Sequence, residues 1–117
     1  MKSAPSRSKN PTWTEEELVL ALELFFELDS PSSFSPSNKK VIALSDELNL
    51  RRAAPASDHK YRNENGVAMK LHNFSRFRNG GGGLQHGGKR EEQIWRTYCN
   101  DRVALRARAN AIRNSSL

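Results

Sequence analysis

The sequence has one cysteine, Cys99, among its 117 residues. A single thiol cannot form a disulfide within the chain or supply a cysteine-rich zinc site. No apolar run approaches the roughly 20 residues of a membrane span, and the start of the chain lacks the apolar segment of a secretory signal. These absences favour a cytoplasmic protein that does not enter the membrane.

Catalytic and cofactor-binding motifs are also missing. The histidines at positions 59, 72 and 86 have no cysteine or carboxylate neighbours at metal-ligand spacing. The glycine-rich segment 79–88 lacks the preceding strand, the glycine spacing and the Ser or Thr after Lys89 that a phosphate-binding loop needs. We therefore predict no metal, no cofactor and no catalytic residue, and assign no enzymatic activity to this chain.

Alternating apolar and polar residues, the pattern of a half-buried strand, are equally scarce. Apolar residues recur mostly at helical spacing, which predicts a mainly α fold: a compact bundle of about five short helices, helix-turn-helix-like, with long glycine-rich and basic loops and at most a small hairpin. A chain of this length forms one small domain. We predict a flexible basic arm over residues 1–12, a single helical domain over 13–114 and a tail over 115–117.

The first predicted helix begins after Thr14. Thr14 and Glu17 have the spacing of a capping box, and Trp13 and Leu18 that of a hydrophobic staple. The expected apolar stripe comprises Leu18, Ala21, Leu22, Phe25 and Phe26. Residues 14–29 carry six acidic and no basic side chains, although the whole chain has a net charge of +6. This segregation is typical of a domain with one DNA-facing side.

A second helix is predicted from Ser35-Pro36, the pattern of an N-cap followed by proline, to about Leu48. The residues expected to face inward are Val41, Ile42, Leu44 and Leu48. The following segment, 50–61, is basic and contains Pro55, so we expect a loop there. This loop could grip a DNA backbone or could simply be solvated.

We interpret residues 61–78 as the segment around which the chain is organised. Asn63 is a good N-cap, and Val67, Leu71 and Phe74 lie on one side of the helix that follows, from about Glu64 to Arg76. The other side is polar and basic, which suits a nucleic-acid groove. The candidate DNA-binding residues are Arg51, Arg52, Lys60, Tyr61, Arg62, Asn63, Asn65, Met69, Lys70, Asn73, Arg76, Arg78 and His86.

Two further helices are expected at the C-terminal end. Residues 89–99 place Ile94, Trp95 and Tyr98 inward. Residues 100–113, capped by Asn100 or Asp101, have their apolar positions at Val103, Leu105, Ala109 and Ile112. Arg102, Arg106 and Arg113 form a stripe on this last helix, which we expect either to be solvated or to contact phosphates.

The segments PTWTEEELVLALELFF, SDELNL, RNENGVAMKLHNF and GLQHGGKREEQIW occur in an order that resembles the N-terminal DNA-recognition domain of bacterial HNH-family, modification-dependent (McrA-like) restriction endonucleases. The resemblance covers nearly the whole chain and implies double-stranded DNA, with methylated or hydroxymethylated cytosine or a phosphorothioate, as the partner. It also implies a C-terminal HNH nuclease domain, which this sequence does not contain.

The alternative function is that of a protein-interaction module. In this hypothesis the acidic first helix and the stripe on the last helix dock a partner protein without direct DNA readout. The salt dependence of binding distinguishes the two, since phosphate contacts release counterions and weaken steeply with salt. The sequence leaves open the modification, the target sequence, base flipping and the oligomeric state.

Overall fold

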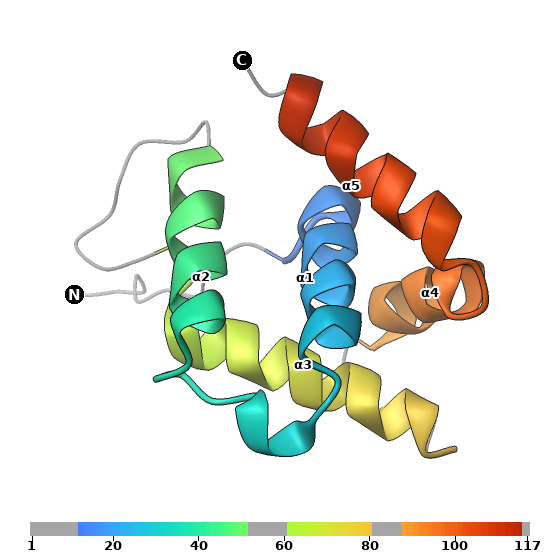
Figure 1. Cartoon of the computed structure of the whole chain (residues 1–117), viewed down its shortest axis with the longest axis horizontal. Coiled ribbons are helices and arrows are strands. Elements are labelled where there is room, and N and C mark those ends of the chain that lie inside the picture. Colours follow the sequence, from blue (N-terminus) through green and yellow to red (C-terminus); the bar gives the residue numbers. More distant parts are fainter. Residues whose placement is uncertain (1–11, 52–60, 81–87, 116–117) are drawn as a thin grey trace, which may run out of the picture.

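Five α-helices make up most of the chain in the computed structural model, which describes residues 12–51, 61–80 and 88–115 (Figure 1). The helices are α1 (Glu15–Leu28), α2 (Lys39–Arg51), α3 (Glu64–Arg78), α4 (Lys89–Tyr98) and α5 (Arg102–Ser115), and a 3-10 turn, Pro31–Ser33, joins α1 to α2. The described segments contain no β-strand. The predicted mainly α fold is confirmed, and no described helix has the length and hydrophobicity to cross a bilayer.

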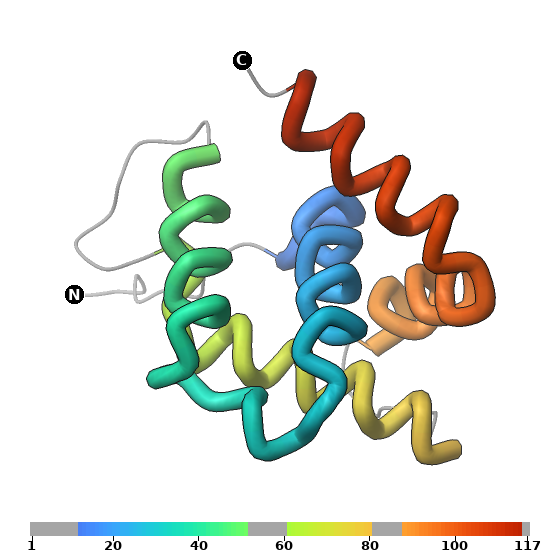
Figure 2. Tube along the Cα trace, viewed as in Figure 1, coloured from blue at the N-terminus to red at the C-terminus, as the bar shows by residue number. Residues whose placement is uncertain are grey.

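Helix α1 forms the centre of this bundle. Its buried side chains cover most of the helix circumference and are Leu18, Val19, Leu20, Ala21, Leu22, Leu24 and Phe25. The other four helices all pack against it, and Figure 2 shows it running through the middle of the trace. The sequence-based choice of residues 61–78 as the organising segment was therefore wrong, because a helix buried on most sides must be surrounded by the others.

The start of α1 matches its prediction. The Thr14 hydroxyl accepts a hydrogen bond from the Glu17 amide at 3.1 Å, and the Glu17 carboxylate accepts one from the Thr14 amide at 2.9 Å. This reciprocal capping box satisfies two donors that a helix start leaves free. Asp29 ends the helix with a φ of 53°, in the left-handed region.

Phe25 joins α1 to its neighbours. Its ring centroid lies 5.3 Å from that of Phe34, 6.0 Å from that of Phe74 in α3 and 5.8 Å from that of Trp95 in α4. Aromatic pairs at such separations add to the stabilisation from buried area. The inner side of α3 (Val67, Leu71 and Phe74) is thus buried against α1 as predicted.

Helix α2 begins later than predicted. The Asn38 side chain accepts hydrogen bonds from the backbone amides of Lys40 and Val41, at 2.8 and 3.3 Å, and so caps the first turn. Ser35 instead bonds within a preceding turn, where its hydroxyl accepts from the Ser37 amide. Because Asn38 is also a strong N-cap and lies closer to the apolar positions, it displaces the expected Ser35-Pro36 start. The helix also continues past Leu48 to Arg51.

The two C-terminal helices lie close to their expected ranges. Asp101 caps α5 by accepting a hydrogen bond from the Ala104 amide at 3.0 Å. Leu105, Ala109 and Ile112 are buried, but Val103 is 83% exposed, so its predicted inward position was wrong. Two residues correspond to about 200° around an α-helix, which places Val103 opposite Leu105.

Candidate nucleic-acid interface

The outer side of α3 presents four of the predicted DNA-binding residues together. Asn65, Met69, Asn73 and Arg76 follow one another at intervals of four, four and three residues, which places them on one side of the helix. Val67, Leu71 and Phe74 occupy the opposite, buried side. None of the four outer side chains has a hydrogen bond or an ion pair with another described residue, and Met69 is 62% exposed. We call this row the α3 outer face.

The N-terminus of α3 is fixed by Asn63. Its side-chain oxygen accepts a hydrogen bond from the Gly66 amide at 2.7 Å, as the sequence predicts for an N-cap. A Cβ at Gly66 would lie only 3.2 Å from that oxygen, so glycine suits this close approach. Asn63 remains exposed, but its carbonyl oxygen is committed to the cap.

Tyr61 and Arg62 are buried, contrary to the expectation that they flank α3 on the DNA side. The Arg62 guanidinium donates to the Glu17 carboxylate at 2.8 Å and to the Tyr61 hydroxyl at 2.9 Å, and it lies 3.9 Å from the centroid of the Tyr61 ring. Its side chain is 2% exposed. A guanidinium held in this way stabilises the packing of the α3 start on α1 and is not available to a phosphate.

Lys70 is also engaged inside the protein. It forms an ion pair with Glu91 of α4, and its ammonium group lies 5.5 Å from the ring centroid of Trp13. The Glu91 side chain is only 5% exposed. Lys70 therefore neutralises a buried carboxylate between α3 and α4, which corrects its predicted position on the open side of the helix.

Arg78 and Arg51 have internal partners as well. Arg78 forms an ion pair with Asp29 at 2.9 Å and lies over the Phe25 ring at 4.6 Å. Arg51, in the last turn of α2 and not in a loop, bonds to Glu47 at 3.2 Å and to the Ile112 carbonyl at 3.3 Å. The remaining candidates, Arg52, Lys60 and His86, lie outside the described residues.

These ion pairs share a pattern that the sequence did not indicate: basic side chains from the rest of the chain turn towards α1. Five of the six acidic side chains between positions 14 and 29 have a basic partner. The pairs are Glu16–Arg108, Glu17–Arg62, Glu23–Arg113, Glu27–Lys40 and Asp29–Arg78. The charge segregation seen in the sequence thus helps to hold the bundle together, since it places opposite charges on α1 and on the elements packed around it.

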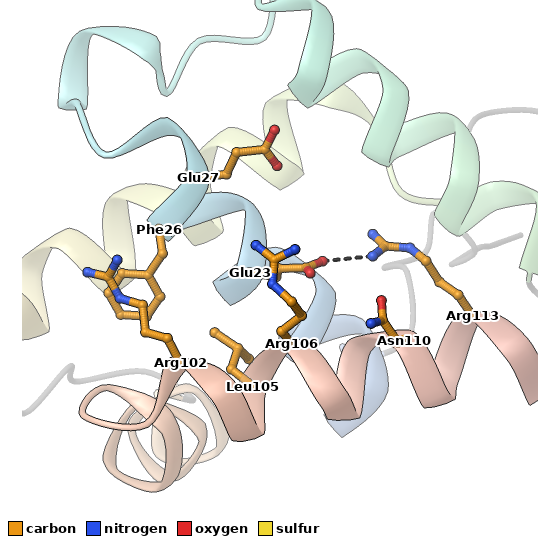
Figure 3. A pocket seen from close by; sticks show the side chains of 8 residues that line it. All are labelled: Glu23, Phe26, Glu27, Arg102, Leu105, Arg106, Asn110 and Arg113. Carbon is orange, nitrogen blue, oxygen red and sulfur yellow. Dashed lines mark hydrogen bonds and ion pairs between the residues drawn. The ribbon is translucent and has the colours of Figure 1, made fainter.

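A cleft of about 500 Å³ lies between α1 and α5 (Figure 3). We call it the α1–α5 cleft. It is lined by Glu23, Phe26, Glu27, Arg102, Leu105, Arg106, Asn110 and Arg113. None of the candidate DNA-binding residues that the structure describes lies in it, but all three arginines of the predicted stripe on the last helix do, and that stripe was the signal that could have located it.

Charge pairing at one end of this cleft shifts two pKa values. Burial alone would raise the pKa of Glu47, but hydrogen bonds and charge from Arg113 and Arg51 outweigh it and lower that pKa below 4.5. Burial would likewise lower the pKa of Arg113, yet its contacts with Glu47 and Glu23 raise it. Both shifts favour the charged forms, so this cluster joins α1, α2 and α5 as ion pairs at neutral pH.

Among the described residues, no group of three or more His, Cys, Asp or Glu side chains is placed to hold a metal ion. Comparison with known proteins adds no assignment: no protein-family model, no curated protein and no solved structure matches this chain.

Proposed function

We propose that this chain is a module that binds double-stranded DNA through the α3 outer face. The observation that carries the proposal is the row of Asn65, Asn73 and Arg76, whose side chains are free of partners among the described residues. An α-helix fits the major groove of B-form DNA, where amide side chains pair with adenine and arginine pairs with guanine. Because these side chains form no hydrogen bonds within the described protein, none has to be broken when they contact DNA.

Met69 lies in the middle of this row and is the apolar group suited to a methyl on a base. Because Tyr61 is buried, Met69 is the remaining one of the two residues considered for this contact. Burying one methyl group contributes about 0.8 kcal/mol, which corresponds to roughly a fourfold preference. We propose 5-methylcytosine as the favoured modification, since the hydroxyl of 5-hydroxymethylcytosine would have to be desolvated against the thioether.

The resemblance described above supports the same proposal and extends it. In that setting the module would deliver an HNH nuclease domain of a bacterial restriction endonuclease to modified DNA. The chain itself would contribute recognition and no catalytic group.

The protein-interaction alternative has less support. It used the acidic first helix together with the stripe of the last helix, and five carboxylates of residues 14–29 are engaged in ion pairs. What remains of it is the surface between α1 and α5, where Arg102 and Arg106 have no described acidic partner.

The test is a binding titration with two duplexes of equal sequence, one containing 5-methylcytosine, over a salt series. We expect binding that weakens with salt, a severalfold preference for the methylated duplex, and loss of that preference in Met69→Ala. Arg76→Ala should weaken binding to both duplexes and reduce the salt slope by about one if the side chain contacts a phosphate. Arg106→Ala removes the same charge from the α1–α5 cleft and is the matched control. Equal affinity of the wild type, Arg76→Ala and Arg106→Ala would contradict the proposal.

A further inference from the structure

The α1–α5 cleft has walls of different chemistry. Helix α5 supplies Arg102, Arg106 and Asn110 at intervals of four residues, so all three line the same edge of the helix (Figure 3). Helix α1 supplies Glu23 and Glu27 on the other side. One wall is therefore rich in hydrogen-bond donors and the other in acceptors.

The carboxylates of the α1 wall are already matched by cations. Glu23 accepts a hydrogen bond from Arg113 at 2.7 Å, and Glu27 forms an ion pair with Lys40. Arg113 is in turn paired with Glu47 at 2.9 Å. Glu47 also pairs with Arg51, so the three carboxylates and three cations of this network cancel within the protein.

Arg102 and Arg106 are different, because no described carboxylate pairs with either. The Arg102 guanidinium lies 4.0 Å from the centroid of the Phe26 ring, which holds it at the wall while its N–H groups stay available. Arg106 is exposed and has no partner within the described ranges. The cleft thus carries two guanidinium groups that have no described carboxylate partner, on residues one helical turn apart.

We propose that the α1–α5 cleft binds an extended, acidic segment of a partner protein. Guanidinium groups bind carboxylates through two parallel hydrogen bonds, so Arg102 and Arg106 suit two acidic side chains of such a segment. A carboxylate has about four acceptor positions, so Glu23 and Glu27 can also accept from the backbone N–H groups of a peptide. The amide of Asn110 can both donate to and accept from a peptide backbone.

A nucleic-acid backbone fits this cleft less well. Its phosphodiester groups carry negative charge and only acceptors towards a protein, so they would meet two carboxylates on the α1 wall with no bond to form. A peptide supplies the N–H donors that this wall requires. The arrangement of donors and acceptors therefore selects an acidic peptide over DNA.

The cleft also lies away from the α3 outer face. Glu23 and Glu27 are each two positions from Phe25, which places them about 200° around α1 from the side that packs on Phe74 of α3. A peptide in the cleft and a duplex on α3 would thus occupy opposite sides of the central helix. A peptide can bind the cleft whether or not α3 binds DNA.

The experiment is a titration of the ¹⁵N-labelled full chain with the peptide GSEAEAEAGS, followed by amide chemical shifts. The matched peptide GSQAQAQAGS and a short DNA duplex are titrated in parallel. We expect the acidic peptide to shift the amides of residues 23–27 and 102–110, and the glutamine peptide to leave them unchanged. Arg102→Gln with Arg106→Gln should weaken peptide binding about tenfold, since each of the two exposed charged contacts contributes roughly a factor of three.

Arg76→Gln, which removes one charge on the other side of α1, is the control and should bind the peptide as the wild type does. Circular dichroism of each variant checks that it is folded, which is expected because both cleft arginines are exposed. The proposal is overturned if the acidic peptide causes no shifts, if the glutamine peptide acts equally, or if the cleft responds to the duplex and not to the peptide.

Discussion

Helices α1 and α3 have 14 and 15 residues, yet they serve the fold in different ways. α1 is buried on most sides and binds the basic residues of its neighbours, whereas α3 buries one side and leaves the other open. In the sequence, the amide and basic side chains of α3 indicated a DNA-binding helix. The comparison shows that density of large apolar residues locates the centre of a small bundle better than a concentration of polar groups does.

The sharpest way to test this comparison is to truncate one side chain in each helix. Phe25→Ala removes a fully buried ring that contacts Phe34, Phe74 and Trp95. We expect a loss of about 3–5 kcal/mol in the free energy of unfolding, measured by urea denaturation. Met69→Ala, on the exposed side of α3, should change it by less than about 0.5 kcal/mol. Similar losses in both variants would contradict the central position of α1.

The next largest effect concerns the arginine that joins the two helices. Arg62→Met leaves the partly buried Glu17 carboxylate without its partner, and we expect a loss of about 3 kcal/mol in unfolding free energy. Adding Glu17→Gln to this variant removes the unpaired charge and should recover part of the loss, because glutamine can keep the capping box. If Arg62→Met were as stable as the wild type, Arg62 would not have the structural role assigned here.

A smaller effect is expected at the open side of α3. Asn73→Ala should leave stability nearly unchanged but weaken binding to the preferred duplex by about 1–3 kcal/mol if its amide pairs with a base. Asn110→Ala, a matched amide deletion in the α1–α5 cleft, should leave DNA binding as in the wild type. Fluorescence anisotropy with a labelled duplex measures the DNA affinity of both variants. An equal loss of affinity in the two would argue against recognition by α3.

The smallest effect is a dependence of stability on pH. Since the folded-state pKa of Glu47 lies below its unfolded value of 4.5, Glu47 contributes stability above pH 4.5. This contribution should be lost as the pH falls through the lower, folded-state pKa. Between pH 5 and 3, the free energy of unfolding of Glu47→Gln should fall less than that of the wild type. The difference should be less than about 1 kcal/mol, because the Glu47–Arg113 ion pair is partly exposed. Thermal unfolding at a series of pH values measures it, and identical profiles would contradict the assignment.

Features fixed by neighbouring residues were predictable from the sequence. The Thr14–Glu17 capping box and the Asn63 cap each depend on residues three positions apart, and both formed as expected. The start of α2 was harder to predict, because Ser35 and Asn38 are both good N-caps and local preference does not decide between them. The buried side of α3 followed from helical spacing alone.

The internal role of the cations could not be predicted in this way. Arg62 bonds to Glu17, 45 positions away, and Lys70 bonds to Glu91, 21 positions away. Helical spacing shows which side of α3 carries a cation, but only the packing of α1 and α4 brings a carboxylate to it. For the same reason the sequence indicated the first helix and the arginine stripe of the last helix as docking surfaces, but not that they line one cleft.

The most direct test of the proposed function is to map amide chemical-shift changes when the ¹⁵N-labelled chain is titrated with a methylated duplex. The account predicts the largest changes at residues 65, 69, 73 and 76, with little change at 102, 106 and 110. The largest changes on α5, or no changes at low salt, would contradict it.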